Sequence, residues 1–563
     1  MNDRFSEMRG LSSQEGYPAQ PVIKGLFNCS NLIGSARQDE TANLTQICIT
    51  PTDTTEMYEN TNSPFFILDL THMNLNNNSS MTRMFSGSNF TEIILNNKTV
   101  DVPTSMAQMF RNCTNLTTVD MSNFITNQTN ALDSIFLGCS NLKTLNLNNF
   151  TSLETSYISK AFSGCQNLEG ELDLRGIKIN SNMTKISLSD IFADCHKITK
   201  VLFRENWHEG KPISSLKNFC KNCYNLEYID LIGMNTLETT DIESMFCGCR
   251  NLEFNLDYFN FARVKNSNFT NTFYDCQKLQ QIEFQALYTS TILNMDMMFK
   301  NCYNLKSIKG GSFDNPSDST KLRSMKEMFA NCYSLETFRP DSFYINRAID
   351  YTGLFYNCMK LKSLYFSDSL DGTSTQYGNI YKEMFYNCKE LESIGGFQFV
   401  GNSPSDTSYM FYNCEKLREA PVEFFKIVNA LNMDYMFYNC KRLTSIPIGL
   451  KAPARTYSKY NGSMVSMFEN CENLQEMDLR HMKFYCDEPG SLFGELKIDK
   501  MFSGCKSLRK LDLRGCTITI NAEVIDFLKD VPIDCEIWID NYSTKYWMQQ
   551  HYPEHTNIIY SGT

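Results

Sequence analysis

The sequence of 563 residues lacks a long apolar run and lacks any block of lysine and arginine. A membrane-spanning helix needs about 18 or more apolar residues in a row, so we expect no membrane span. The formal net charge is −11 and the sequence pI is near 5.3. An acidic chain without basic patches argues against nucleic acid as a partner. The segment 1–10 also lacks the apolar stretch of a signal peptide, which favours an intracellular or virion-associated protein over one at the cell surface.

Recognisable catalytic motifs are missing as well. The chain has no phosphate-binding loop, no dinucleotide fingerprint, no nucleophile elbow and no His-Glu-x-x-His segment. The six histidines are scattered, and the one close pair is separated by Pro553. We therefore predict a protein that is not an enzyme and that needs no cofactor. A thiol or zinc enzyme is the alternative from another functional class.

The sequence does contain one motif that recurs along most of its length. It reduces to Met-Phe-x-Asn-Cys-x-x-Leu-x-x-Ile and is represented by the stretch 381–394. From Ser88, which stands in the cysteine position, successive copies are 25 to 34 residues apart and most often 26. A period of this length is typical of a solenoid, in which each unit buries its apolar face against its neighbours.

The residue before the cysteine is Asn, Asp or Gly in all 17 copies. These residue types tolerate a positive φ angle, and such a residue commonly ends a helix. We therefore expect the Met-Phe pair to close a short helical turn, after which the chain reverses. The segment after the cysteine, for example Leu226 to Leu231, alternates apolar and polar residues as a half-buried strand does. Successive strands should pair in a parallel sheet, spaced by about 4.8 Å.

These motifs resemble the BspA-like, or Treponema-type, leucine-rich repeats, in the Met-Phe-x-x-Cys variant of mycoplasma surface lipoproteins. The resemblance covers roughly residues 25–515. It implies an α/β fold, a right-handed leucine-rich-repeat solenoid with a parallel sheet on the concave face and short helical turns on the convex face. It also implies a role in surface recognition or adhesion.

The repeat divides the chain into four parts. We expect an N-terminal arm at 1–24, degenerate N-terminal repeats or a cap at 25–83, regular repeats at 84–515, and a C-terminal cap at 516–563. Within that last part, residues 521–529 and 544–551 have helical patterns and 535–539 has a strand pattern. A cap covers the apolar face of the last repeat, which every solenoid needs.

Most of the 22 cysteines lie once per repeat, which is typical of a small buried core residue. Two extra cysteines stand in adjacent repeats, giving Cys220-Lys-Asn-Cys223 and Cys247-Gly-Cys249. Stacking could bring these four together as weak candidates for a tetrahedral zinc site. The alternatives are a disulfide between Cys220 and Cys247, or unlinked thiols, and we predict no metal.

Two columns of side chains are candidates for partner binding. The polar position inside each strand is often acidic, with Asn146 in the same column, and its acidic members are Asp120, Asp173, Asp230, Glu283, Asp478 and Asp512. Such a column suits a partner with basic groups, although a solvated strand edge would look the same. Four tyrosines recur two residues before the cysteine, namely Tyr356, Tyr386, Tyr412 and Tyr438. Tyrosine is favoured at interfaces, while stacking between repeats explains the column equally well.

The sequence thus favours a non-enzymatic recognition scaffold that binds a protein or a glycan. A structural or accessory component of a phage virion, or of another large assembly, fits the missing signal peptide, and self-assembly or docking in such a particle is part of that hypothesis. The alternative is an adhesin on a microbial surface.

Overall fold

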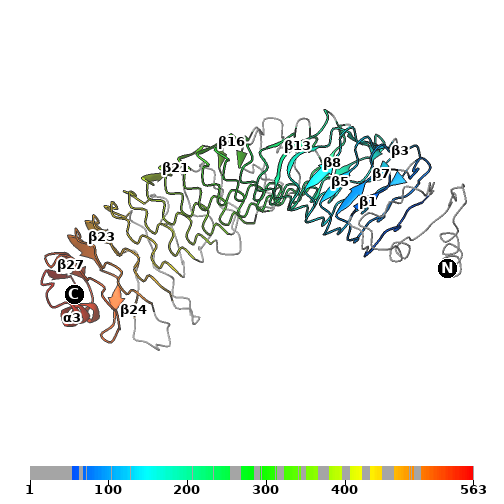
Figure 1. Ribbon diagram of the computed structural model, residues 1–563. Coiled ribbons are helices and arrows are strands. Elements are labelled where there is room, and N and C mark those ends of the chain that lie inside the picture. Colours follow the sequence, from blue (N-terminus) through cyan, green and yellow to red (C-terminus); the bar gives the residue numbers. More distant parts are fainter. Residues whose placement is uncertain are drawn as a thin grey trace, which may run out of the picture. The chain divides into compact units, whose positions relative to one another are not determined.

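The computed structural model describes residues 53–561 except for 63–66, 72, 103, 127–128, 206, 209, 232–233, 237, 254–267, 285–291, 293, 311, 314–322, 340–341, 344–349, 366–379, 396–405, 421–431, 447–461, 481, 483–484 and 487–495. The chain divides into two compact units, Met1–Lys211 and Pro212–Thr563. Within each unit successive coils stack side by side, as the ribbon in Figure 1 shows. The predicted N-terminal arm, 1–24, lies outside the described residues.

The first unit contains short parallel strands at three positions of each coil. The strand after the cysteine is represented by β1 (Ile67–Asp69), β2 (Glu92–Ile94), β5 (Thr118–Asp120) and β8 (Thr144–Asn146), which form one sheet in that order. A second sheet has the order β11 (Ile177–Ile179), β9 (Thr151–Thr155), β6 (Ile125–Thr126), β3 (Thr99–Val100). Further strands are β4 (Thr104–Ser105) paired with β7 (Thr129–Ala131), β10 (Gly170–Asp173) paired with β13 (Ile198–Leu202), and β12 (Ile186–Ser187).

The second unit repeats this plan. Its pairs and sheets are β16 (Gln281–Phe284), β17 (Ser307–Gly310) and β19 (Thr337–Arg339); β18 (Ser312–Phe313) with β20 (Ser342–Phe343); β21 (Ser363–Tyr365) with β22 (Ser393–Gly395); β24 (Tyr485–Cys486) with β26 (Thr517–Ile518); and β23 (Glu476–Asp478), β25 (Lys510–Asp512), β27 (Glu536–Ile539) and β28 (Ile558–Tyr560). β14 (Ile213–Ser215) and β15 (Tyr228–Ile229) lie at its start. Parallel bridges eight residues before each cysteine link every coil from Ser215 to Lys497. The strands predicted from the Leu-x-x-Ile-x-Leu pattern are therefore present and parallel.

The segment before each cysteine is built from consecutive turns. We expected a short helix there, and this expectation was wrong. In the coil of Cys358, alternate amides donate to the next coil, for example Phe355 N to Met384 O at 2.8 Å and Asn357 N to Tyr386 O at 2.8 Å. The amides between them bond within the turn, as Cys358 N does to Phe355 O at 3.1 Å. A helix would keep all of these bonds inside one segment. The solenoid is confirmed, but turns replace the short helices.

Two residues with positive φ shape each of these turns. The predicted one, just before the cysteine, has a φ between 57° and 79° in all 16 described copies, from Gly87 to Gly504. The other lies four residues earlier, for example Glu383 with φ 58° and Lys500 with φ 53°. This second position carries Asn, Asp or Gly in only four described coils, at Asp190, Asn218, Asn271 and Gly353, so its residue types did not indicate a positive φ.

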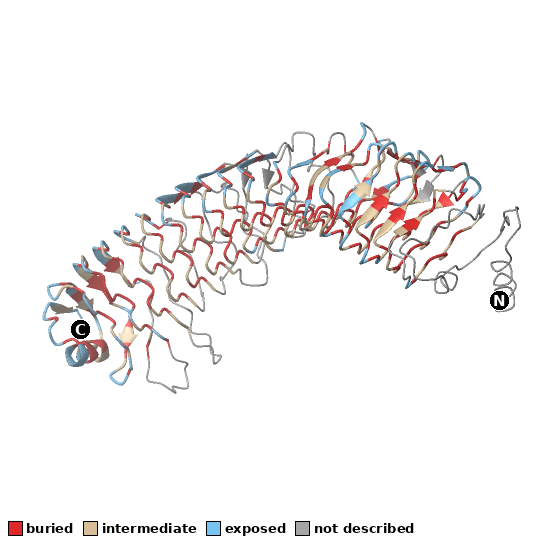
Figure 2. Ribbon diagram, in the orientation of Figure 1, coloured by how far each residue is buried: buried red, intermediate tan, exposed pale blue. Residues whose placement is uncertain are grey.

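Stacked phenylalanines fill the interior of both units. The phenylalanine three residues before the cysteine recurs coil after coil, and neighbouring rings stack with centroids 4.8 to 5.9 Å apart. Tyr58 continues the column at its N-terminal side in the first unit. These rings are buried together with the Met, Cys and Leu of the repeat, and Figure 2 shows buried residues in every coil.

The C-terminal residues correct one prediction and confirm two. Residues 521–529 form turns instead of a helix. Their carbonyls accept bonds from the coil of Cys505, as Lys529 O does from Gly504 N at 2.7 Å, and Asp526 and Asp530 have positive φ. The segment is thus one more turn of the repeat, with Val531 in the cysteine position. Strand β27 and helix α3 (Tyr542–His551), capped by Asn541, lie where we predicted a strand and a helix.

Two predictions remain open. The boundaries of the four parts, 1–24, 25–83, 84–515 and 516–563, stay predictions. The placement of the sheet on a concave face and of the turns on a convex face concerns the shape of the whole array, and it also stays a prediction.

Candidate recognition surface

The repeated cysteines form a column inside the coils. In most described coils this thiol donates to the carbonyl of the phenylalanine in the preceding coil, as Cys358 Sγ does to Phe329 O at 3.2 Å and Cys440 Sγ to Phe411 O at 3.1 Å. That carbonyl also accepts the amide of its own coil's cysteine, so both of its lone pairs are used. Burial raises the pKa of most of these thiols, such as Cys358 and Cys440, well above their ordinary value. The pKa of Cys113 is lowered: burial acts to raise it, but side-chain hydrogen bonds to Cys139 and Ser88 lower it. Since the thiolate is the reactive form, the thiols with a raised pKa are unsuited to nucleophilic chemistry.

The four cysteines considered for zinc do not form a shared site. Cys220 is buried in the phenylalanine position, three residues before Cys223, whereas Cys247 is half-buried and stands two residues before Cys249. Cys249 Sγ itself donates to the carbonyl oxygen of Cys220 at 3.1 Å. Among the described residues no group of three or more His, Cys, Asp or Glu side chains is placed to hold a metal ion. The offset of the two extra cysteines also argues against a disulfide between them.

The acidic column lies in or next to the strands that follow the cysteine. Several of its members already form ion pairs within the chain. Asp173 binds Arg175, Asp478 binds Arg480, and Asp512 binds Arg514, all through side-chain contacts. The Arg175 guanidinium lowers the pKa of Asp173. Asp120 accepts the amide of Ser122 at 2.9 Å, while Glu283 is exposed in β16 and Asp230 is half-buried after β15. Their role in partner binding stays a prediction, and a basic partner would compete with these internal pairs.

The predicted tyrosine column is present in the second unit. Rings of Tyr356, Tyr386, Tyr412 and Tyr438 stack with centroids 4.6 to 4.7 Å apart and planes within 7°. All four side chains are half-buried, and burial raises the pKa of Tyr356, Tyr386 and Tyr412.

A second stack, which the sequence reading missed, lies beside this column. Tyr409 and Tyr435 stack at 4.8 Å, and Tyr409 lies 5.8 Å from Tyr412. Tyr409 and Tyr435 hold the first positive-φ position of their turns. The six tyrosines, Tyr356, Tyr386, Tyr409, Tyr412, Tyr435 and Tyr438, are called the tyrosine surface below.

An asparagine ladder runs next to the tyrosine surface. The Asn357 side-chain amide donates to Asn331 Oδ1 at 2.9 Å, and Asn387 donates to Asn357 Oδ1 at 2.8 Å. Asn439 bonds to Asn413 in the same way at 2.7 Å. These are the residues with positive φ, so one side chain both permits the turn and ties it to the neighbouring coil. The ladder is interrupted between Asn387 and Asn413, where Asn387 Oδ1 has no hydrogen-bond partner in the described part of the chain, and on either side of this point it ties the turns that carry the tyrosines to their neighbours.

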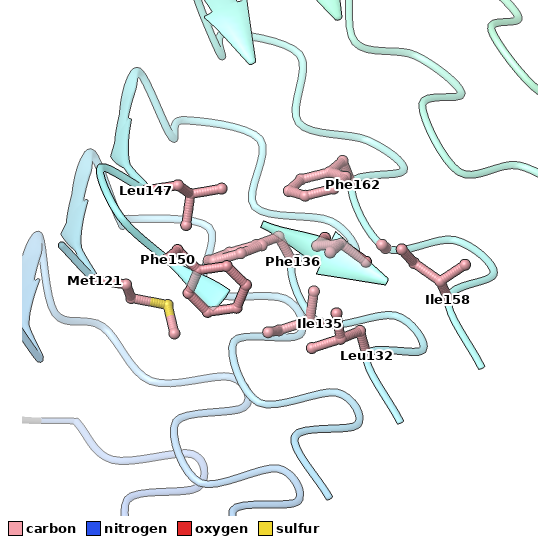
Figure 3. A pocket seen from close by; sticks show the side chains of 10 residues that line it. Met121, Leu132, Ile135, Phe136, Leu147, Phe150, Ile158 and Phe162 are labelled. Carbon is pink, nitrogen blue, oxygen red and sulfur yellow. The ribbon is translucent and has the colours of Figure 1, made fainter. Parts of the chain in front are cut away.

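The cavity in Figure 3 does not provide a ligand site. It lies inside the first unit and has a volume of about 10 Å³, with Met121, Phe136, Phe150 and Phe162 among its apolar lining residues. A space of this size holds roughly one water molecule. It is a packing gap of the core. The described residues also contain no helix that is long and apolar enough to cross a membrane.

Stacked parallel coils, the inward Leu and Cys columns and an exterior of aligned side chains define a leucine-rich-repeat solenoid. Two family models match the sequence. The model for a Mycoplasma protein of unknown function matches residues 52–175, 186–309 and 214–338, and the model for the BspA-type leucine-rich-repeat region matches residues 326–453 and 352–483. Over residues 326–483 the sequence thus matches the BspA-type leucine-rich-repeat family. That family consists of repeat scaffolds and is generally non-catalytic.

The chain is also similar to solved structures of leucine-rich-repeat proteins. One from Bacteroides ovatus is 15% identical over 83% of this chain and 92% of that one, with a TM-score of 0.32. A leucine-rich cell-surface protein from Faecalibacterium prausnitzii is 15% identical over 80% of this chain and 83% of that one, with a TM-score of 0.28. One from Leptospira interrogans is 12% identical over 87% and 94%, with a TM-score of 0.21. No curated protein matches the sequence.

Proposed function

We propose that this chain is a non-enzymatic recognition scaffold that binds a protein or glycan partner through the tyrosine surface. The observation that carries the proposal is the alignment of six half-buried tyrosines in two stacks within one unit. Interior stacking is already supplied by the phenylalanine column of the same coils. The tyrosines on the exterior add a second aromatic layer where a partner can reach it.

Physical arguments support this surface over the acidic column. A tyrosine ring buries a large area while its hydroxyl stays hydrated, and tyrosine is enriched among interface residues with the largest energetic effect. The stacked rings are already ordered by their neighbours and by the asparagine ladder, which lowers the entropy lost on binding. The paired carboxylates of Asp173, Asp478 and Asp512 would contribute less, because an exposed ion pair is typically worth about 0–1 kcal/mol.

Where the protein acts when it binds this partner is also a proposal. Docking within a phage virion or another large assembly, without export, is the first candidate. Adhesion at a microbial surface is the second, and it is favoured by the match to the BspA-type model. A thiol enzyme is disfavoured, because burial raises the pKa of the core thiols.

The test compares a variant of the tyrosine surface with a matched control. A Tyr386→Ser, Tyr412→Ser double variant removes the centre of the longer stack, and Tyr157→Ser removes a tyrosine of the first unit that is 62% exposed. A partner would be identified by cross-linking in the native source, purified, and titrated by surface plasmon resonance. We expect the double variant to weaken binding at least tenfold and the control to bind like the wild type. Equal affinities of all three proteins would contradict the proposal.

A further inference from the structure

A polar hollow of about 390 Å³ opens on the exterior of the second unit, on four consecutive coils. At this hollow the coil of Cys249 carries small residues at two positions. Cys247 stands where the tyrosine surface carries tyrosine, and Gly248 stands where most neighbouring coils carry asparagine or aspartate. A Cβ atom at Gly248 would lie 2.9 Å from Asn222 Oδ1 and 3.3 Å from Tyr224 Cε1. Asn222 and Tyr224 therefore approach the backbone at Gly248 closely, and the hollow lies beside the short Cys247 side chain.

Aromatic rings form the sides of this hollow. Tyr224, Tyr274 and Tyr303 all line it and are half-buried. The Arg250 guanidinium carbon lies 4.6 Å from the centre of the Tyr224 ring, and Tyr303 stacks on Tyr333 at 5.3 Å. The rings are thus held in place by neighbours while they border the hollow.

A network of planar polar groups lies between the rings. Asp275 is buried, with Oδ2 accepting from Arg250 Nε at 2.7 Å and Oδ1 accepting from Gln277 Nε2 at 2.9 Å. The Asn301 side-chain amide donates to the Tyr274 hydroxyl at 3.2 Å. The single positive and single negative charge cancel, so the lining carries donors and acceptors without a net charge.

We infer that this hollow binds a neutral saccharide unit of a glycan. Its volume falls in the range of about 300–1,000 Å³ that is usual for small-molecule sites. Adjacent hydroxyls of a pyranose present paired donors and acceptors, which suit carboxylate, amide and guanidinium groups. The C–H face of the sugar ring packs against tyrosine. A fully ionic ligand fits less well, because Arg250 and Asp275 already neutralise each other.

This inference rests on the proposed recognition function and narrows the partner at this hollow to a sugar. The binding variant is Cys247→Tyr, which places in this coil the residue that occupies the same position in the coils of Cys276 and Cys358. The new ring would fill the hollow and stack on Tyr274, so the fold should be retained. The matched control is Ser163→Tyr, which introduces the same residue at the equivalent position of the first unit. Circular dichroism and urea unfolding check that both variants fold.

The probes are glucose, galactose, mannose, N-acetylglucosamine and their disaccharides, with N-acetylneuraminic acid as the acidic comparison. Saturation-transfer NMR detects binding, and isothermal titration measures it. We expect at least one neutral sugar to bind the wild type and Ser163→Tyr equally, and to bind Cys247→Tyr at least tenfold more weakly. A Gln277→Ala variant should weaken the same sugar through lost hydrogen bonding.

Three results would overturn the site. They are no binding by any neutral sugar, equal binding to the filled variant, or preference for N-acetylneuraminic acid over every neutral probe. If any one of these results occurs while the tyrosine-surface variant still loses its partner, the saccharide site fails and the recognition function stands. If the tyrosine-surface variant also binds its partner normally, the proposed function fails as well.

Discussion

A cysteine in each coil serves as a small apolar residue and as a hydrogen-bond donor to the coil before it. The sequence predicted its burial, because one cysteine per repeat at a fixed place is typical of a core residue. The bond from Cys332 Sγ to Phe299 O, at 3.2 Å, was not predictable. It depends on the register between coils, which the spacing of cysteines alone does not determine.

These thiols should make the free energy of unfolding fall in alkaline solution. Burial raises the pKa of Cys332, Cys358 and Cys440 above their ordinary value of 9.0. Below pH 9 the thiols are protonated in both the folded and the unfolded chain, so they add no pH dependence. Above pH 9 only the unfolded chain releases these protons, and each thiol then lowers the free energy of unfolding by about 1.4 kcal/mol per pH unit.

We therefore expect the urea midpoint to be flat from pH 6.5 to 8 and to fall steeply between pH 9 and 10.5. Tyr356, Tyr386 and Tyr412, whose pKa values are also raised by burial, act in the same direction at higher pH. Urea titrations followed by circular dichroism measure this. A midpoint that stays constant up to pH 10.5 would show that the thiols are not buried as described.

Among the elements, the turn before the cysteine was only partly predicted, because one of its two residues with positive φ was expected from the sequence and the other was not. Asn387 was predicted to have a positive φ and does, at 59°. The earlier position, Glu383 with φ 58°, was missed because glutamate has no preference for that region. Without it, the Met-Phe pair was interpreted as a helical turn. The same error produced the predicted helix at 521–529.

The asparagine ladder gives a prediction that separates backbone geometry from side-chain bonding. Asn357 has φ 59°, donates to Asn331 and accepts from Asn387. Asn357→Gly keeps the backbone free to adopt this φ but loses both bonds, whereas Asn357→Ala also adds strain of roughly 1–2 kcal/mol. We expect destabilisation in both variants, by about 1–3 kcal/mol for glycine and more for alanine, measured by urea unfolding.

A matched control for the ladder is Asn304, which lies outside it. Its side chain donates to the carbonyl of Gln277 at an exposed site, and its φ is not positive. Asn304→Ala should cost less than either change at Asn357. Equal stability of Asn357→Gly and Asn357→Ala would mean that the positive φ carries no strain there.

The hollow beside Cys247 and Gly248 was not predictable from the sequence. Small residues also fill both positions in Ser86-Gly87, Ser163-Gly164 and Ser503-Gly504, so such a pair does not indicate a hollow. The pairing of Arg250 with Asp275 was not predictable either, because their contact needs the register of neighbouring coils. The tyrosine column was predicted from its spacing, but its neighbours Tyr409 and Tyr435 were not, since they replace glutamate and serine at the same repeat position.

At the scale of the whole molecule, each coil contacts mainly its neighbours, so stability should spread along the array as a sum of local and nearest-neighbour terms. The central feature of this arrangement is that alternate amides of every turn donate to the next coil. In the coil of Cys414 these amides are Thr407, Tyr409, Phe411 and Asn413, with N–O distances of 2.8 to 2.9 Å.

Native-state hydrogen exchange, resolved to single amides, tests this arrangement most directly. We predict slow exchange at Tyr409, Phe411 and Asn413, as slow as for the amides of the paired strands β21 and β22. Exchange at the rate of an exposed surface turn at these positions would contradict the stacking of coils through their turns.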